Sequence, residues 1–179
     1  MAHSERCIKC QHCMAICPNG ALTFNNTNTV DGKITGSGTA TNAGTLNLAG
    51  TNTIDTIIGT GTTTIVEGSD TTINSKLEQT NLINNQLLTI NAGHLDIKNG
   101  VTNNNTLVLK GAGTLKTDIT GGTVNIADDS VNTVINEAKI NVNQLDIYNN
   151  VNPQELVNNG TIIANNMTNI KIRYFKLHN

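Results

Sequence analysis

Short alternations of apolar and polar residues recur along the chain after residue 30. The clearest are Thr45-Leu46-Asn47-Leu48, Leu107-Val108-Leu109 and Val124-Asn125-Ile126. Alternation with a period of two is typical of a β-strand that buries one face. Turn-forming Asn, Gly and Asp residues separate the runs, and successive runs begin about 8 to 12 residues apart. The chain is therefore predicted to fold as a series of short strands.

The distance between equivalent runs constrains the fold more than the runs themselves. Pairs of runs recur at about 19 to 20 residues, as from Leu46 to Ile65, from Leu88 to Leu107 and from Leu95 to Leu115. A fixed period of this length is the sequence signature of a solenoid. We predict a mainly β fold, a right-handed parallel β-helix (β-solenoid) over residues 30–170. About seven coils, stacked at about 4.8 Å each, would form a rod about 35 Å long.

The same alternation predicts which side chains face the interior. They are Leu46, Leu48, Ile65, Leu95, Ile97, Leu107, Leu109, Val124, Ile126, Leu145 and Ile147. This almost purely aliphatic set favours a solenoid over a Greek-key sandwich, which the strand spacing also allows.

Local signals predict the corners and one helical turn. Asn99-Gly100, Gly121-Gly122 and Asn159-Gly160 are typical of corners that need a positive φ. Pro153-Gln154-Glu155-Leu156 is compatible with one helical turn that has Pro at its first position. The basic, aromatic segment from Ile170 to Leu177 is compatible with a strand that caps the last coil.

All four cysteines lie in one short run near the N-terminus, spaced C-x2-C-x2-C-x3-C and followed by Pro18. Bacterial ferredoxins use this run to hold [4Fe–4S] clusters. Residues 1–24 resemble one half of a bacterial two-cluster ferredoxin, and residues 25–179 are predicted to form a separate solenoid domain. The resemblance implies single-electron transfer to a redox partner protein through a [4Fe–4S] cluster. Its ligands would be Cys7, Cys10, Cys13 and Cys17.

Other roles for the cysteines remain open. Zinc also binds four thiolates, although its sites usually combine two separated C-x2-C pairs. A disulfide framework would close only one small loop. In two-cluster ferredoxins the fourth cysteine serves the other cluster, and this chain has no second cysteine set. Either the site is vestigial, or Cys17 closes it locally, or a homodimer through the cysteine run completes it.

The repeats themselves carry a second resemblance. Gly44-Thr45-Leu46-Asn47-Leu48, Gly113-Thr114-Leu115 and Gly122-Thr123-Val124-Asn125-Ile126 resemble passenger segments of bacterial autotransporters, particularly Gly/Asn/Thr-rich surface antigens of rickettsia-like bacteria. That resemblance implies surface display and adhesion. The alternative function is therefore an adhesin or autotransporter passenger fragment whose cysteine run is vestigial or a fusion artefact.

Composition narrows the function further. A net charge of −2, 13% charged residues and four aromatic residues argue against nucleic-acid binding. No apolar run reaches 18 residues and no signal peptide is evident, so the sequence predicts a cytoplasmic protein without membrane insertion. A passenger fragment would instead lie at the cell surface. His94, His178 and the loop pair Asp128-Asp129 form no catalytic constellation, so no enzyme is predicted.

Overall fold

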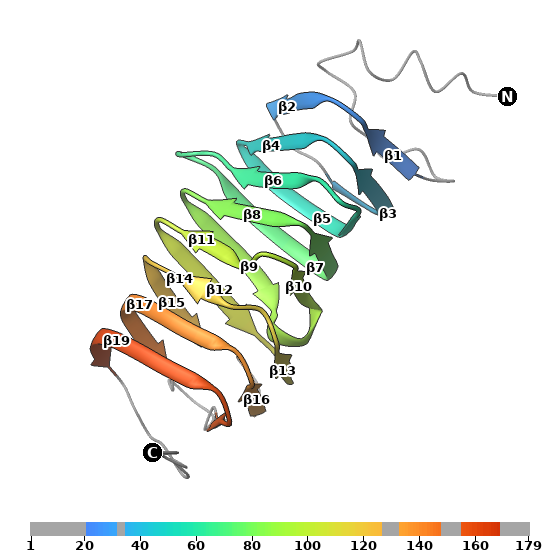
Figure 1. Cartoon of the computed structure of the whole chain (residues 1–179). Coiled ribbons are helices and arrows are strands. Elements are labelled where there is room, and N and C mark those ends of the chain that lie inside the picture. The colour runs from blue at the N-terminus through green and yellow to red at the C-terminus, as the bar shows by residue number, and fades with distance from the viewer. Residues whose placement is uncertain (1–20, 32–34, 127–132, 148–154, 169–179) are drawn as a thin grey trace, which may run out of the picture.

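The computed structural model describes residues 21–31, 35–126, 133–147 and 155–168. In these residues, parallel strands stack along one axis as the coils of a rod (Figure 1). The chain completes about seven turns. The predicted parallel β-solenoid is therefore confirmed, and the Greek-key sandwich is excluded because none of the described strands pair antiparallel.

The strands form three series, each running along the rod. The first series consists of β1 (Ala21–Phe24), β3 (Thr35–Asn42), β5 (Thr51–Ile58), β7 (Asp70–Gln79), β9 (Leu87–Asn91), β12 (Thr106–Lys110), β15 (Thr123–Ile126) and β17 (Lys139–Ile147). The second consists of β2 (Thr27–Asp31), β4 (Thr45–Ala49), β6 (Thr62–Ile65), β8 (Asn81–Asn84), β11 (Val101–Asn103), β14 (Ile119–Thr120) and again β17. Because β17 pairs with both β15 and β14, it joins the two series into one sheet.

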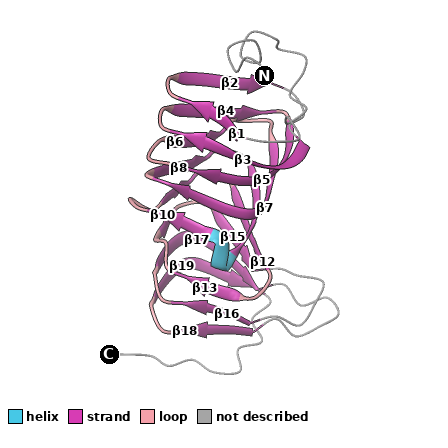
Figure 2. Cartoon of the chain, turned by 90° about the vertical axis from the view of Figure 1, so that its right-hand side faces the viewer, coloured by secondary structure: helices cyan, strands magenta, loops and turns pink. Residues whose placement is uncertain are grey.

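The remaining strands complete the coils. β10 (Leu95–Ile97) pairs with the end of β7, and β19 (Thr161–Thr168) pairs with most of β17. The third series, a separate sheet, consists of β13 (Gly113–Leu115), β16 (Thr133–Asn136) and β18 (Glu155–Asn158). Figure 2 shows these three strands stacked toward the C-terminal end of the rod.

Aliphatic side chains fill the interior of the rod. The eleven residues predicted to point inward are all buried, none of them more than 4% exposed. In one column, Leu88, Leu107, Val124 and Leu145 lie in register across four coils and are fully buried. Burying such a side chain contributes about 1.5–3 kcal/mol, so the core is held by repetition of one kind of contact.

The coils are not of constant length, which corrects one predicted register. Leu88 pairs with Leu107, as the nineteen-residue spacing predicts. However, Ile65 pairs with Leu48 rather than with Leu46, whose partner is Thr63. Leu46 and Leu48 both point inward, so the alternation alone cannot distinguish a coil of seventeen residues from one of nineteen. Registers in the structure run from seventeen residues in β4–β6 to twenty-two in β17–β19.

The glycine corners are confirmed in part. Gly100, Gly121 and Gly122 have φ values of +81°, +84° and +59°, in the region where glycine is favoured. Gly160 has no positive φ, so that prediction is wrong. Glycine is required there for a different reason, because an added Cβ would lie 2.2 Å from the carbonyl oxygen of Ala138.

The predicted helical turn is wrong where the structure describes it. Glu155 and Leu156 belong to β18, which pairs with β16 in register, and this ladder determines the conformation. The helical element of the described residues is a short 3-10 turn, η2 (Ala92–His94), where the Asn91 side chain accepts a hydrogen bond from the Gly93 amide at 2.9 Å. No helix in the described part of the chain has the length and hydrophobicity needed to span a bilayer.

Candidate functional site

The four cysteines lie outside the described residues, as do Asp128, Asp129 and His178. The described structure begins three residues after Pro18, where Ala21–Phe24 form β1. β1 pairs in parallel with β3, with Ala21 opposite Thr39. The cysteine run therefore leads directly into a strand of the rod.

The donor chemistry of this run fits an iron–sulfur cluster. Thiolates are the soft ligands that such clusters prefer, and the run supplies four of them. Elsewhere, over the residues whose positions are described, no three His, Cys, Asp or Glu side chains come together in a group that could hold a metal ion. His94 is exposed at the end of η2. The cysteine run is thus the candidate metal centre, and the described rod offers no competing one.

Buried asparagine side chains form hydrogen bonds at the corners of the rod. The side-chain nitrogen of Asn103 lies 3.2 Å from the carbonyl oxygen of Asn105, 3.2 Å from that of Gly121 and 2.9 Å from that of Thr123. Its side-chain oxygen accepts from Asn84 at 2.8 Å. One amide therefore satisfies backbone groups of its own turn and of the next coil, which would otherwise be costly to bury.

The same arrangement recurs at other corners. Each of these asparagines contacts the residue two positions on, as Asn42 does with the amide of Gly44, and reaches the neighbouring coil as well. The members are Asn42, Asn84, Asn103 and Asn136, all at most 1% exposed. Sequence reasoning assigned asparagine to turns but missed its burial. The available signal was an Asn in the inward phase at the end of an alternating run.

The outward side of the second series carries a column of mainly uncharged polar residues. Strand register aligns Thr29, Asn47, Thr64, Ile83, Thr102, Thr120, Asn141 and Ile163. We call this set the outer column. Neighbouring amides also bond between coils, for example Asn81 to Thr62 at 3.2 Å and Asn99 to Asn81 at 2.9 Å. The eight residues of the outer column include no acidic or basic side chain.

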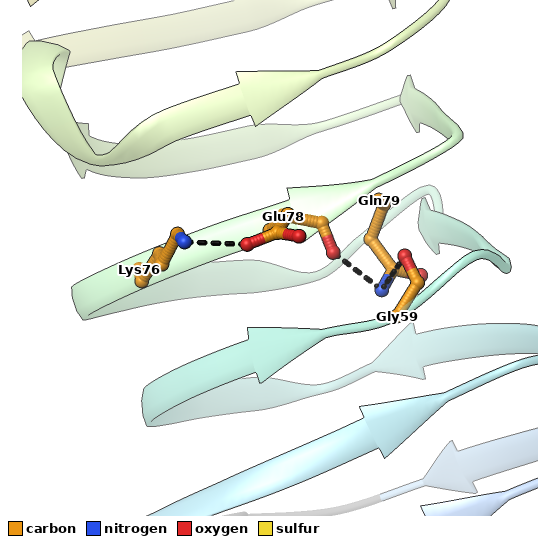
Figure 3. Close-up of polar contacts among 4 residues, drawn as sticks. All are labelled: Gly59, Lys76, Glu78 and Gln79. Atoms are coloured by element: carbon orange, nitrogen blue, oxygen red, sulfur yellow. Dashed lines mark hydrogen bonds and ion pairs between the residues drawn. The ribbon is translucent and has the colours of Figure 1, made fainter.

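Charged side chains gather on the outside of β7 and β10. Lys76 and Glu78 form an ion pair, and the hydrogen bond to Glu78 followed by its charge raises the pKa of Lys76, with a smaller contribution from Asp96. Next to this pair, the Gln79 side chain turns inward and donates to the carbonyl oxygens of Glu78 at 2.8 Å and Gly59 at 3.3 Å (Figure 3). An exposed pair of this kind contributes little to stability, and the geometry indicates a solvated surface rather than an active site.

One family matches part of the chain. Residues 3–23 match the family of 4Fe-4S binding domains, and the matched range includes all four cysteines and the first three residues of β1. No curated protein and no solved structure matches the chain.

Proposed function

We propose that this chain binds a [4Fe–4S] cluster through Cys7, Cys10, Cys13 and Cys17 and transfers single electrons to a redox partner protein. The match of residues 3–23 to the family of 4Fe-4S binding domains carries the proposal. A bound cluster supplies reversible one-electron chemistry.

The residues of the run have distinct roles in this proposal. The thiolates hold the iron, and the apolar residues between them, such as Ile8 and Ile16, limit the access of water. Burial and hydrogen bonding set the potential of such centres. The rod is a non-catalytic scaffold, and the protein acts in the cytoplasm, where thiols stay reduced.

Anaerobic reconstitution with iron and sulfide tests this proposal. We expect about four irons per chain and the brown colour of a cubane cluster, with both lost in Cys10→Ser. A matched control is His12→Ser, which changes the same loop without removing a thiolate and should leave the iron content unchanged. A colourless, iron-free product would overturn the proposal, and zinc in place of iron would assign a zinc site.

The role of Cys17 separates the two ways of closing the cluster. In the dimeric arrangement, Cys17 of one chain serves the cluster held by Cys7, Cys10 and Cys13 of the other, an isologous contact of the kind that two-fold dimers use. Cys17→Ser should then lose iron and yield monomers together. A brown monomer with about four irons would instead support local closure.

Surface adhesion is the second candidate function, favoured by the outer column, which presents Thr and Asn without charge along the rod. Treatment of intact expressing cells with an external protease tests it. Degradation of the chain while a cytoplasmic marker survives would support display at the surface. Full protection would remove this candidate.

A further inference from the structure

Two asparagine–glycine pairs lie at corners of the described rod. They are Asn99-Gly100 and Asn159-Gly160, and both asparagines are exposed; a third pair, Asn19-Gly20, lies outside the described residues. In such a pair the backbone nitrogen of glycine can attack the side-chain carbonyl carbon of asparagine, because glycine has no side chain to obstruct a close approach. The attack needs an asparagine side chain that is free to turn and a glycine N–H that is not bonded elsewhere. The hydrogen bonds at each corner therefore decide how readily the pair reacts.

The Asn99-Gly100 corner holds both reacting groups. The side-chain nitrogen of Asn99 donates to the side-chain oxygen of Asn81, on the preceding coil, at 2.9 Å. The Gly100 amide donates to the carbonyl oxygen of Ile97 at 3.1 Å. Both hydrogen bonds must break before the Gly100 nitrogen reaches the Asn99 side chain. This corner is therefore protected.

The Asn159-Gly160 corner lacks both restraints. Over the residues that the structure describes, neither the Asn159 side chain nor the Gly160 amide has a hydrogen-bond partner. At the corresponding point of an earlier corner, the Gly44 amide donates to the side-chain oxygen of Asn42 at 3.1 Å. Here Asn158 occupies the position of Asn42, but it donates its side-chain nitrogen to the carbonyl oxygen of Gly160 at 3.2 Å. The Gly160 nitrogen is thus available for attack.

We propose that Asn159 is a deamidation site of the folded protein, and that the reaction weakens the pairing of β19 with β17. The Gly160 nitrogen bonds to the side-chain carbonyl carbon of Asn159 while the bond from that carbon to the side-chain nitrogen breaks. Ammonia leaves, and it carries the proton that the Gly160 amide loses. Water then opens the cyclic imide at one of its two carbonyl groups. The products are aspartate and isoaspartate, and the reaction needs no co-reactant other than water.

The new carboxylate would lie next to an existing one. The strand registers on both sides of this corner, β16–β18 and β17–β19, are twenty-two residues, so Asn159 is aligned with Glu137 on the preceding coil. Both side chains are exposed. Neighbouring strands are about 4.8 Å apart, and like charges that face each other at this distance destabilise the pairing.

The isoaspartate product would also disturb the backbone. The Asn159 amide donates to the carbonyl oxygen of Asn136 at 2.8 Å, and the Thr161 amide donates to that of Ala138 at 3.0 Å. Isoaspartate adds one atom to the main chain between these two hydrogen bonds. They cannot both keep their geometry, so the start of β19 separates from the preceding coil.

Mass spectrometry of the full-length chain tests the first part of the proposal. The protein is incubated in neutral buffer and then digested in water enriched in heavy oxygen, so that deamidation during digestion carries the isotope and is subtracted. Fragmentation of the peptides assigns the remaining deamidation to single residues. We expect Asn159 to react about tenfold or more faster than Asn99, because two hydrogen bonds protect the Asn99 corner.

The matched control is the same chain unfolded in urea. Both pairs then lose their hydrogen bonds, and their rates should become similar. Similar rates in the folded chain, or the same ratio of rates in the folded and unfolded chains, would overturn the proposal.

Thermal unfolding tests the second part. Asn159→Asp reproduces the aspartate product and should lower the melting temperature, and adding Glu137→Gln should restore most of the loss. Asn104→Asp is the matched control, because Asn104 is also exposed and its side chain bonds to the uncharged Asn85 on the preceding coil. Equal melting temperatures of Asn159→Asp and Asn104→Asp, or no recovery with Glu137→Gln, would overturn the proposed effect on β19.

Discussion

The cysteine run and the solenoid rod depend on the sequence in different ways. In the run, the proposed chemistry depends on the four cysteines within Cys7–Cys17, and no other part of the chain repeats this set. In the rod, each structural role is repeated from coil to coil, so that Leu88, Leu107 and Val124 perform the same task. The proposed function depends on the spacing of cysteines over eleven residues, whereas the fold depends on a periodicity sustained over more than a hundred residues. Substitutions that destabilise the rod should therefore leave iron binding by the cysteine run unchanged, and the reverse.

A substitution in the core of the rod should show the largest difference between the two regions. Leu107→Ala removes a fully buried side chain and should lower the free energy of unfolding by about 2–5 kcal/mol, measured by urea denaturation. Iron bound per folded chain should not change. Val108→Ala, which alters the outward neighbour of Leu107, is the control and should have a smaller effect. A loss of iron in Leu107→Ala at conditions where the rod stays folded would contradict independence.

A corner glycine should come next. In Gly122→Ala, the new Cβ would lie 2.4 Å from the carbonyl oxygen of Asn105, at a φ of +59°. Backbone strain and the clash together should cost about 3 kcal/mol. Gly68→Ala has a similar φ of +79° but no atom within 4 Å of the new Cβ, so it should cost about 1 kcal/mol. Equal thermal shifts in the two variants would show that close stacking of the coils is not the reason for glycine.

The buried asparagines should have a smaller effect. Asn103→Ala leaves the Asn84 amide and the carbonyl oxygen of Thr123 without this partner and should cost about 1–3 kcal/mol. The control is Asn104→Ala, which changes an exposed neighbour whose side chain donates a hydrogen bond to the side-chain oxygen of Asn85 at 2.8 Å. That variant should stay within about 0.5 kcal/mol of the parent. A neutral Asn103→Ala would show that water replaces the amide.

Changes in the cysteine run should leave the rod almost untouched. Replacing Cys7, Cys10 and Cys13 with Ser should preserve the β-sheet circular dichroism and keep the unfolding free energy within about 0.5 kcal/mol of the parent. A large loss of stability in this triple variant would mean that the cluster stabilises the first coil, next to β1. The stability of the rod would then depend on the cysteine run, and the two regions would not be independent.

The smallest expected effect lies on the surface of β7. Glu78→Gln should lower the pKa of Lys76, because Glu78 supplies the leading causes that raise it, and Asp96→Asn should lower it less. A raised folded-state pKa favours folding below the ordinary lysine pKa, and this contribution is lost as pH rises through the raised value. NMR titration of Lys76 measures the shift. An unchanged pKa in Glu78→Gln would show that the ion pair does not persist in solution.

The fold could be predicted from the sequence because both the alternation of apolar residues and the length of the repeat can be read directly from the residue order. All eleven residues predicted to point inward are buried. The predicted pairing of Leu46 with Ile65 is wrong, because two inward residues of one strand are equivalent under a period of two. Sequence reasoning could not show that Asn84 and Asn103 are buried, since asparagine is usually exposed in turns. For the candidate site, the cysteine spacing and the ferredoxin resemblance that it carries predict the four cysteines as ligands. This stays a prediction, because the cysteines lie outside the described residues and spacing does not encode how they are arranged in space.

The hydrogen bonds between coils also bear on how the chain folds. Every one of the described strand pairs joins residues about one coil apart, from seventeen to twenty-two positions. The entropy of closing each new loop is therefore nearly the same wherever in the rod it forms. Once two adjacent coils have nucleated, growth should propagate in either direction by nearest-neighbour steps, as in a one-dimensional lattice. Lengthening such a rod by one coil would add one more interface without slowing the formation of any other.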